Sequence, residues 1–301
     1  MTAYLHRAVP VARRVRLPLS RDQLMLLMAA INELFLGLDI YLAHSISGTI
    51  VPYEWIPIIF GPAAGMLLLV AGLLALRARP LATVIANGVF LLSIVVGLLG
   101  AYFHLSRAAL PTAPPGSRLT VNLLVWAPPV LGPLMFSLVG WLGISASWVE
   151  DPADSGRLRL LGGRALRLPY AKTRAYLIIT GLAALFTVIS AVLDHARTGF
   201  ENPWLWAPTA VGVFATTAAV VLAGIDRPNR TDLWTYIGAM LLMIAVGVVG
   251  AFLHVQDNLV AGGQFVTERF IRGAPVLAPL LFANVGTLGL IALLPPDDPG
   301  G

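Results

Sequence analysis

The 301-residue chain contains no cysteine. This absence excludes disulfides, covalent c-type haem attachment, iron–sulfur clusters and thiolate copper sites. A bound metal ion would have to be held by histidine, carboxylate, methionine or carbonyl groups.

The chain also has little charge. Only 12% of its residues are charged, whereas 57% are hydrophobic, and the mean hydropathy is +0.82. About a quarter of the residues in a soluble domain are charged, so this composition predicts a membrane protein. The sequence has no phosphate-binding loop, no nucleophile elbow and no HExxH zinc signature. Any chemistry is therefore expected within the membrane part or at its edge.

Eight apolar segments have roughly the length of 20 residues that a helix needs to cross a bilayer. They cover residues 23–45, 56–76, 81–105, 122–147, 175–196, 204–225, 233–255 and 271–294. Backbone groups in lipid must bond within their own segment, which favours helices. The sequence thus predicts an all-α, polytopic integral membrane protein with eight transmembrane helices. The first of them is too long for a signal-peptide core, so we expect it to remain uncleaved.

The two halves of the sequence resemble each other. VGLLGAYFHL at 96–105 recurs as VGVVGAFLHV at 246–255, and PVLGPLMF at 129–136 recurs as PVLAPLLF at 275–282. Four helices return the chain to its starting side, so a tandem duplication would give two parallel copies related by a pseudo-twofold axis. The predicted organisation is a basic tail (1–21), a four-helix repeat (22–147), a basic linker (148–174), a second four-helix repeat (175–294) and a C-terminal tail (295–301).

The basic residues are unevenly distributed between the two sides of the membrane. If the amino terminus is cytoplasmic, 15 of the 20 Lys and Arg residues face the cytoplasm. The positive-inside rule therefore places both termini there. The net charge of +5 then reflects orientation and contact with anionic lipid, and no nucleic-acid partner is expected. The Ala/Gly/Arg-rich composition, without an organelle targeting signal, predicts a bacterial cytoplasmic (inner) membrane protein.

Four of the five histidines occupy matching places in the two halves. They are His44, His104, His195 and His254. Each lies 20 to 23 residues along an odd-numbered segment, which places all four in one layer at the outer membrane boundary. Histidine binds metals and carries protons, so we expect these four residues to be metal ligands. Two bis-histidine haems and one central copper, zinc or iron site are both open, as are proton handling and hydrogen bonding at helix ends.

Two histidines stand above glycine pairs. Gly97 and Gly100 precede His104 by seven and four residues, and Gly247 and Gly250 stand in the same relation to His254, so each pair forms a groove on the histidine's face of the helix. In this local design the two short segments resemble the haem-binding helices of b-type cytochromes. The resemblance implies haem b lying against the glycines. Small residues also pack membrane helices together, which is the alternative explanation.

Two acidic residues accompany the histidines. Glu33 lies eleven residues before His44, on nearly the same helix face and roughly 16 Å deeper. A carboxyl group at this depth is a candidate proton relay or a polar contact between helices. Its counterpart in the second half is Ala184. Asp257 follows His254 by three residues and is a candidate second-shell acceptor for its ring, or an exposed carboxylate.

These features together predict a membrane-embedded redox or electron-transfer protein. Haem b or copper would be held by the outer-side histidines, and a quinol or a periplasmic redox protein would exchange electrons with it. One alternative is a proton-coupled transporter with Glu33 as the coupling residue. The other is a non-catalytic membrane subunit or assembly factor of a larger complex.

Overall fold

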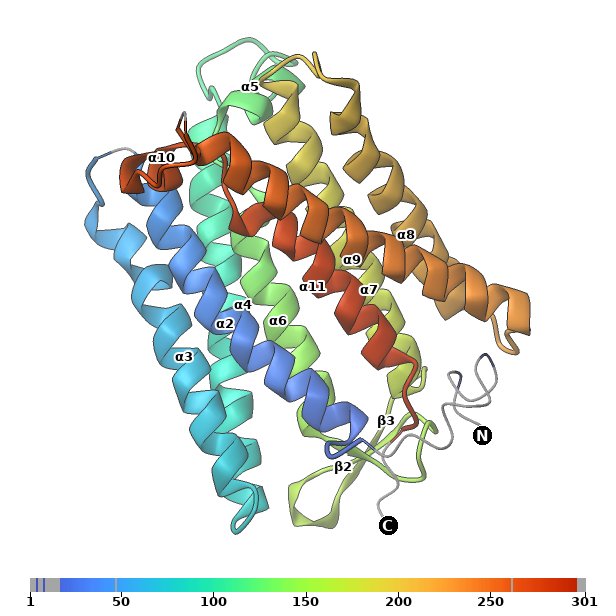
Figure 1. Ribbon diagram of the computed structural model, residues 1–301. Coiled ribbons are helices and arrows are strands. Elements are labelled where there is room, and N and C mark those ends of the chain that lie inside the picture. The colour runs from blue at the N-terminus through green and yellow to red at the C-terminus, as the bar shows by residue number, and fades with distance from the viewer. Residues whose placement is uncertain (1–3, 5–7, 9–16, 47, 261, 297–301) are drawn as a thin grey trace.

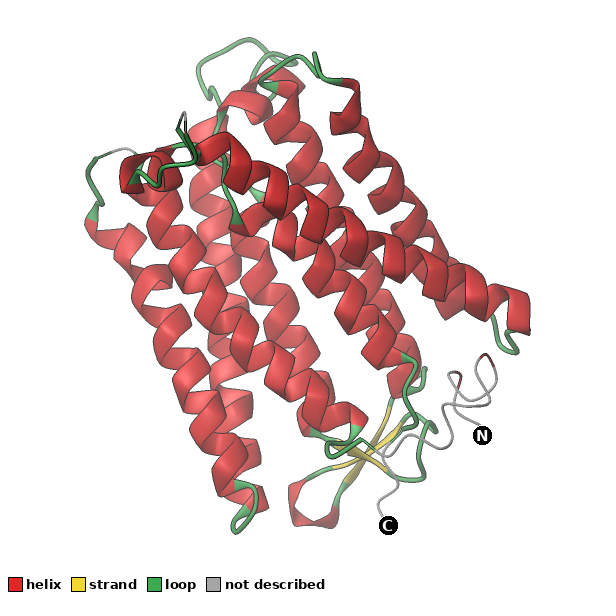
Figure 2. Ribbon diagram, viewed as in Figure 1, coloured by secondary structure: helices red, strands yellow, loops and turns green. Residues whose placement is uncertain are grey.

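The computed structural model describes residues 4, 8, 17–46, 48–260 and 262–296. The described chain forms a helical bundle with a small antiparallel sheet at one end (Figures 1 and 2). Most of the two predicted tails, 1–21 and 295–301, lies outside the described residues.

The first half of the chain forms three long helices, one short helix and one helix of intermediate length. They are α2 (Arg21–Ser45), α3 (Trp55–Leu74, preceded by the 3-10 turn η2, Pro52–Glu54), α4 (Arg79–Ala108), α5 (Val121–Trp126) and α6 (Leu131–Ser147). Helix α2 begins with a capping box, in which Ser20 and Gln23 each accept a hydrogen bond from the other's backbone N–H.

The second half repeats this order of elements. It contains α7 (Lys172–Ala196), α8 (Trp206–Gly224, preceded by η4, Pro203–Leu205), α9 (Arg230–Asn258), α10 (Thr267–Arg272) and α11 (Leu277–Ala292). Helix α9 also begins with a capping box, formed by Asn229 and Asp232.

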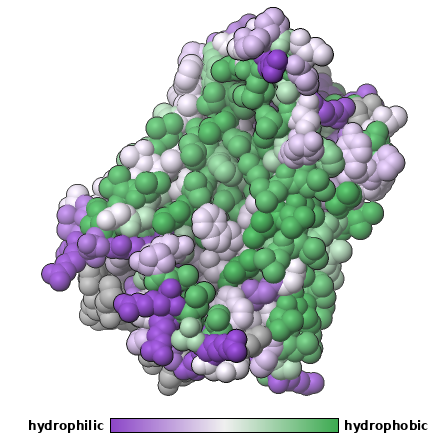
Figure 3. Space-filling view, turned by 180° about the vertical axis from the view of Figure 1, so that it is seen from behind, coloured by the Kyte–Doolittle hydropathy of each residue, from purple (hydrophilic) through white to green (hydrophobic). Residues whose placement is uncertain are grey.

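In the described part of the chain, six helical segments are long and apolar enough to cross a membrane. They are Arg21–Ser45, Pro52–Leu74, Arg79–Ala108, Lys172–Ala196, Pro203–Gly224 and Arg230–Asn258. The chain is therefore a multi-pass integral membrane protein, as its hydropathy predicts. Figure 3 shows apolar side chains covering the middle of one face, with hydrophilic residues gathered mainly towards its ends.

The predicted helices at 122–147 and 271–294 are each interrupted. In the first, α5 ends at Trp126 and α6 begins at Leu131; in the second, α10 ends at Arg272 and α11 begins at Leu277. The interruptions contain Pro128 and Pro129 in the first half and Gly273 and Pro275 in the second. Proline lacks an N–H and disfavours a helical residue before it, which favours an end of the helix at these positions. With 17 and 16 residues, α6 and α11 reach about 25 Å, less than the bilayer core of ~30 Å.

The linker between the halves is folded. Three strands, β1 (Val149–Glu150), β2 (Arg157–Arg159) and β3 (Ala165–Arg167), form an antiparallel sheet in the order β1-β2-β3, with a 3-10 turn η3 (Leu161–Gly163) between the last two. The buried carboxylate of Glu150 accepts hydrogen bonds from the backbone N–H groups of Asp154, Gly156 and Lys172. These bonds tie the loop between β1 and β2 to the start of α7.

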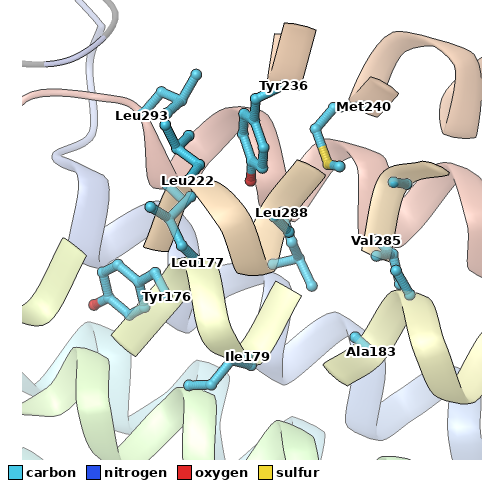
Figure 4. Close-up of a cluster of buried hydrophobic side chains, with 14 of the residues drawn as sticks. Tyr176, Leu177, Ile179, Ala183, Leu222, Tyr236, Met240, Val285, Leu288 and Leu293 are labelled. Atoms are coloured by element: carbon cyan, nitrogen blue, oxygen red, sulfur yellow. The ribbon is translucent and has the colours of Figure 1, made fainter. Parts of the chain in front are cut away.

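Two apolar clusters form the core. The larger lies mainly among α7, α8, α9 and α11, where Tyr176, Leu222, Tyr236 and Met240 are almost fully buried (Figure 4). The smaller lies among α2, α3, α4 and α6 and includes Phe90. Helices α2, α4, α7 and α9 all run away from the end that carries the sheet (Figure 1). We call that end the sheet end and the opposite end the histidine end.

Candidate functional site

The four histidines of the quartet lie at the histidine end, as their spacing predicts. His44 and His195 occupy the last turns of α2 and α7, and His104 and His254 each lie four residues before the end of α4 and α9. All four side chains are half-buried. The structure groups them as two pairs, one in each half.

In the first half, His44 and His104 face each other. Their ring centroids are 6.1 Å apart, and the ring planes are inclined by 54°. The Nδ1 atom of His44 lies 2.9 Å from the carbonyl oxygen of Ile40, and the Nδ1 atom of His104 lies 2.9 Å from that of Pro129. A carbonyl oxygen only accepts hydrogen bonds, so both Nδ1 atoms carry a proton. In each neutral ring, Nε2 is then the nitrogen with the lone pair that a metal ion needs.

In the second half, His254 repeats the arrangement of His104. Its Nδ1 atom lies 2.9 Å from the carbonyl oxygen of Pro275, and its side chain is close enough to His195 for the two to interact electrostatically. The Nδ1 atom of His195 differs from that of His44, because it is buried and has no hydrogen-bond partner among the described residues. The two pairs therefore share a plan but not every contact.

Phe200 borders the second pair. It contacts the ring of His195 at a centroid distance of 6.1 Å and stacks on Trp206 at 4.3 Å. Phe200 has a φ of 54°, a left-handed backbone conformation that is uncommon for a residue other than glycine. The contact between Phe200 and His195 was not predicted from the sequence.

The interrupted helices explain how His104 and His254 find their acceptors. Within a helix, a carbonyl group bonds to the N–H four residues later, but the residues four after Pro129 and Pro275 are Pro133 and Pro279, which have no N–H. Pro129 and Pro275 also lie in the interruptions just before α6 and α11, so their carbonyl groups can accept the imidazole N–H. The prolines thus leave an unbonded carbonyl group for the histidine in both the His104 and the His254 contact.

Two polar side chains that the sequence analysis missed hold these interruptions. In the second half, the buried Asn258 donates from Nδ2 to the Ala274 carbonyl at 2.7 Å and accepts from the Ala274 N–H at 2.8 Å. In the first half, Arg197 donates to the carbonyl groups of Val125 and Ala127, at 2.8 and 3.2 Å. Arg197 belongs to the C-terminal end of α7, so this contact joins the two halves of the chain.

The four histidines do not form one metal site. Within residues 17–46, 48–260 and 262–296, no three His, Asp or Glu side chains come close enough together to hold one ion. The other arrangement left open by the sequence, in which each half uses its own pair, stays a prediction.

The glycine grooves are filled by neighbouring helices. A Cβ atom on Gly97 would meet the backbone of Pro133 and Ser137 on α6, and one on Gly247 would meet Pro279 and Ala283 on α11. Gly100 and Gly250 likewise face the rings of Pro133 and Pro279. We assign all four glycines to helix packing. Their role as a cofactor surface stays a prediction that these contacts do not favour.

Asp257 is exposed at the end of α9, and its backbone carbonyl accepts a hydrogen bond from Arg269 at 2.8 Å. The acceptor that the structure gives to His254 is the carbonyl group of Pro275. The hydrogen bond to the His254 ring that was predicted for Asp257 is made by a backbone carbonyl group, which has no signature in the sequence.

Glu33 is fully buried near the middle of α2. Its Oε1 atom is 2.5 Å from the hydroxyl oxygen of Ser93 on α4, and its Oε2 atom has no hydrogen-bond partner among the described residues. The corresponding positions of the second half hold Ala184 and Met243, which are both fully buried. The structure thus joins a carboxyl and a hydroxyl group in one half and replaces both with apolar side chains in the other.

A buried polar network at the sheet end joins α2 to α7. Arg21 donates to the Thr173 hydroxyl group at 2.6 Å, and Lys172 forms an ion pair with Asp22, which also accepts from the Tyr176 hydroxyl group at 2.7 Å. Lys172 and Thr173 lie 151 residues after Arg21 and Asp22, the same separation as that between His44 and His195. At that separation, the two contacts are reciprocal.

Polar groups also meet at the centre of the bundle. A cavity of about 30 Å³ lies among α2, α6, α7 and α11, and Asn284 donates a hydrogen bond of 2.7 Å to Asn32 beside it. The cavity is large enough for one or two water molecules. Its other lining residues are apolar.

Comparison of the chain with models of protein families, with curated proteins and with solved structures gives no match.

Proposed function

We propose that this protein is a membrane-embedded redox or electron-transfer protein and that His44 and His104 hold its metal. The observation that carries the proposal is the pairing of these rings at 6.1 Å, with both Nδ1 atoms bonded to backbone carbonyl groups. Two imidazoles that bind one ion from opposite sides, each about 2.0 Å from it, have centroids about 6 Å apart. Metal-bound histidines commonly donate their other ring N–H to a carbonyl or carboxylate group.

Copper is the first metal to test, and haem b is the second. Imidazole nitrogens suit copper and iron, and the cysteine-free chain offers no thiolate. A single copper ion needs little more than the space between two rings. Haem also needs a slot as wide as its macrocycle, whereas the space beside Gly97 and Gly100 is occupied by α6.

We assign a second site of the same type to His195 and His254. The repeated bond between His254 and Pro275 supports this assignment. The unpartnered Nδ1 atom of His195 distinguishes the second site from the first, so we expect the two sites to differ in metal affinity.

We further propose that the chain crosses the membrane eight times as a tandem duplication of a four-helix unit. In this arrangement α5 with α6, and α10 with α11, each complete a crossing as an interrupted helix. The reciprocal contacts of Arg21 and Lys172, and the equivalent bonds of His104 and His254, support a pseudo-twofold relation between the halves.

The distribution of positive charge supports an orientation in which the sheet end faces the cytoplasm. Both termini would then be cytoplasmic, and the histidine end would face the periplasm of a bacterial cell. A metal at that boundary can exchange electrons with a quinol in the lipid or with a periplasmic redox protein. These are the partners that we propose beside the bilayer itself.

The proposal is tested by an absorption spectrum and a metal analysis of the purified protein, after expression with added copper and, separately, with added haem precursor. We expect the wild type to carry copper or haem in stoichiometric amount. His104→Ala and His254→Ala should each lose the copper or haem that is bound at one of the two sites. A wild type that is colourless and metal-free under both conditions would reject the proposal. The proton-coupled transporter and the non-catalytic subunit would then be the remaining candidates.

A further inference from the structure

Glu33 is a titratable group that the proposed metal sites do not use. It lies twelve residues into the 25-residue helix α2, about 18 Å from the start of that helix, and none of its surface is exposed. Helix α3 packs closely against this part of α2, because a Cβ atom on Gly61 would stand only 2.6 Å from the carbonyl oxygen of Glu33. The carboxyl group is thus enclosed within the first half of the bundle.

Among the described residues, no positively charged side chain pairs with this carboxyl group. Helices α3 and α6 contain no charged residue, and on α4 the stretch between Arg79 and His104 contains none. On α2 itself, the acidic residues nearest in sequence are Asp39 and Asp22, and Asp22 is paired with Lys172. None of the ion pairs among the described residues involves Glu33. An ionised carboxylate here would be a buried charge without a partner, which is strongly unfavourable.

The hydrogen bonds around Ser93 point to a proton on Glu33. The Ser93 hydroxyl oxygen lies 2.5 Å from the Oε1 atom of Glu33 and 3.2 Å from the carbonyl oxygen of Val89. A serine hydroxyl has a single proton and can serve only one of these acceptors fully. If Glu33 is neutral, its own O–H donates to Ser93, and Ser93 donates to Val89. Both contacts are then made at the same time.

We propose that Glu33 and Ser93 form a proton-binding site buried in the first half of the protein, with the proton held on the carboxyl group of Glu33. The second half has lost or never had this site, since Ala184 and Met243 replace both members. Proton binding is thereby restricted to one of two otherwise similar halves. This assignment stands on the contacts of Glu33 alone and does not require a metal.

The site lies between the two helices that carry the first histidine pair. Glu33 precedes His44 by eleven residues on α2, and Ser93 precedes His104 by eleven residues on α4. Loss of the proton would replace a hydrogen-bonded neutral pair with an unpaired buried charge between α2 and α4. A change in their packing would also change the spacing of the histidines, a consequence that rests on the proposed metal function.

The test is an infrared difference spectrum between the wild type and Glu33→Gln at neutral pH. A protonated carboxyl group has a C=O stretching band above the amide band, whereas a carboxylate has its two bands below. We expect the wild type to show the carboxyl band that Glu33→Gln lacks. Glu54, which pairs with Arg107 at 3.5 Å, gives the matched control, because Glu54→Gln should remove carboxylate bands. Carboxylate bands assigned to Glu33 would overturn the proposal.

A second measurement does not depend on the folding of a variant. The chain has five glutamates, so wild-type protein labelled with 13C at the glutamate carboxyl group should give few resonances. We expect one of them to keep the shift of a neutral carboxyl group at pH 7 while the others show carboxylate shifts. Five carboxylate resonances at that pH would contradict a proton on Glu33.

Discussion

The imidazole Nδ1 atom of His104 lies 2.9 Å from the carbonyl oxygen of Pro129, and His254 bears the same relation to Pro275. Each bond links the third long helix of its half to the interruption before α6 or α11. Pro133 and Pro279, four residues further along, have no N–H to bond these carbonyl groups, so each carbonyl group can accept from the histidine and fix its tautomer. This repeated contact places the proton on Nδ1 in both halves, which leaves the lone pair of the neutral ring on Nε2.

Asn258 should stabilise the second of these interruptions. Asn258→Ala would leave the N–H and carbonyl groups of Ala274 without the two bonds of 2.8 and 2.7 Å that they now make. Losing a buried pair of this kind costs about 1–3 kcal/mol. We expect a lower thermal midpoint in detergent and a changed 15N ring shift for His254, while the His104 signals stay in place. Unchanged His254 signals in the variant would show that Asn258 does not position this ring.

Lys172 should contribute more to stability than an exposed basic residue. Lys172→Met takes the nearer of two cations from the buried carboxylate of Asp22 and leaves Arg21, whose Nε atom is 3.7 Å away. Breaking a buried ion pair costs up to about 3–5 kcal/mol. Arg174 pairs with the exposed Asp226, so Arg174→Met should cost less than about 1 kcal/mol. Thermal unfolding of the two variants beside the wild type measures how much stability each substitution removes. Equal losses of stability would contradict a special role for the Lys172 pair.

Gly97 should not tolerate a larger side chain. Gly97→Ala places a methyl group against the backbone of α6, and overpacking of this kind costs about 1–3 kcal/mol. Gly88 lies on the same helix with open space around its Cα, so Gly88→Ala is the matched control and should be neutral or slightly stabilising. The measurement is the thermal midpoint of each variant in detergent. If both substitutions are equally tolerated, α4 and α6 do not pack as described.

The orientation can be tested cleanly because the chain has no cysteine of its own. Ser117→Cys places a thiol at the histidine end, and Ser155→Cys places one at the sheet end; both serines are exposed. In intact cells, a membrane-impermeant maleimide should label Cys at position 117 only. The position 155 variant should react only after the membrane is permeabilised. The reverse pattern would place the histidine end in the cytoplasm.

Much of the fold could be predicted because hydropathy alone decides which segments enter a bilayer. The segments that became α2, α4, α7 and α9 were long, apolar and matched between the halves, and their spacing placed all four histidines of the quartet at one end. The interruption at Pro129 was harder to place, since a membrane helix can also continue through a proline when neighbours satisfy its backbone.

The contacts that shape the candidate site were not predictable in the same way. The acceptor of His254 is a backbone carbonyl, which any residue could supply. Asn258 looks like an ordinary polar residue at a helix end, and Lys172 looks like one more charge in a basic linker. Their roles depend on which helices meet, and that depends on packing between segments far apart in the sequence.

The most direct test of the central claim is the metal content per chain of His44→Ala and His104→Ala, measured beside the wild type. His6→Ala serves as the control, because His6 is the one histidine outside the proposed pairs. We expect the control to retain the metal content of the wild type and each of the other two variants to lose the first site. Metal content that is the same in all four proteins, or absent from the wild type after loading with copper and with haem, would contradict the account.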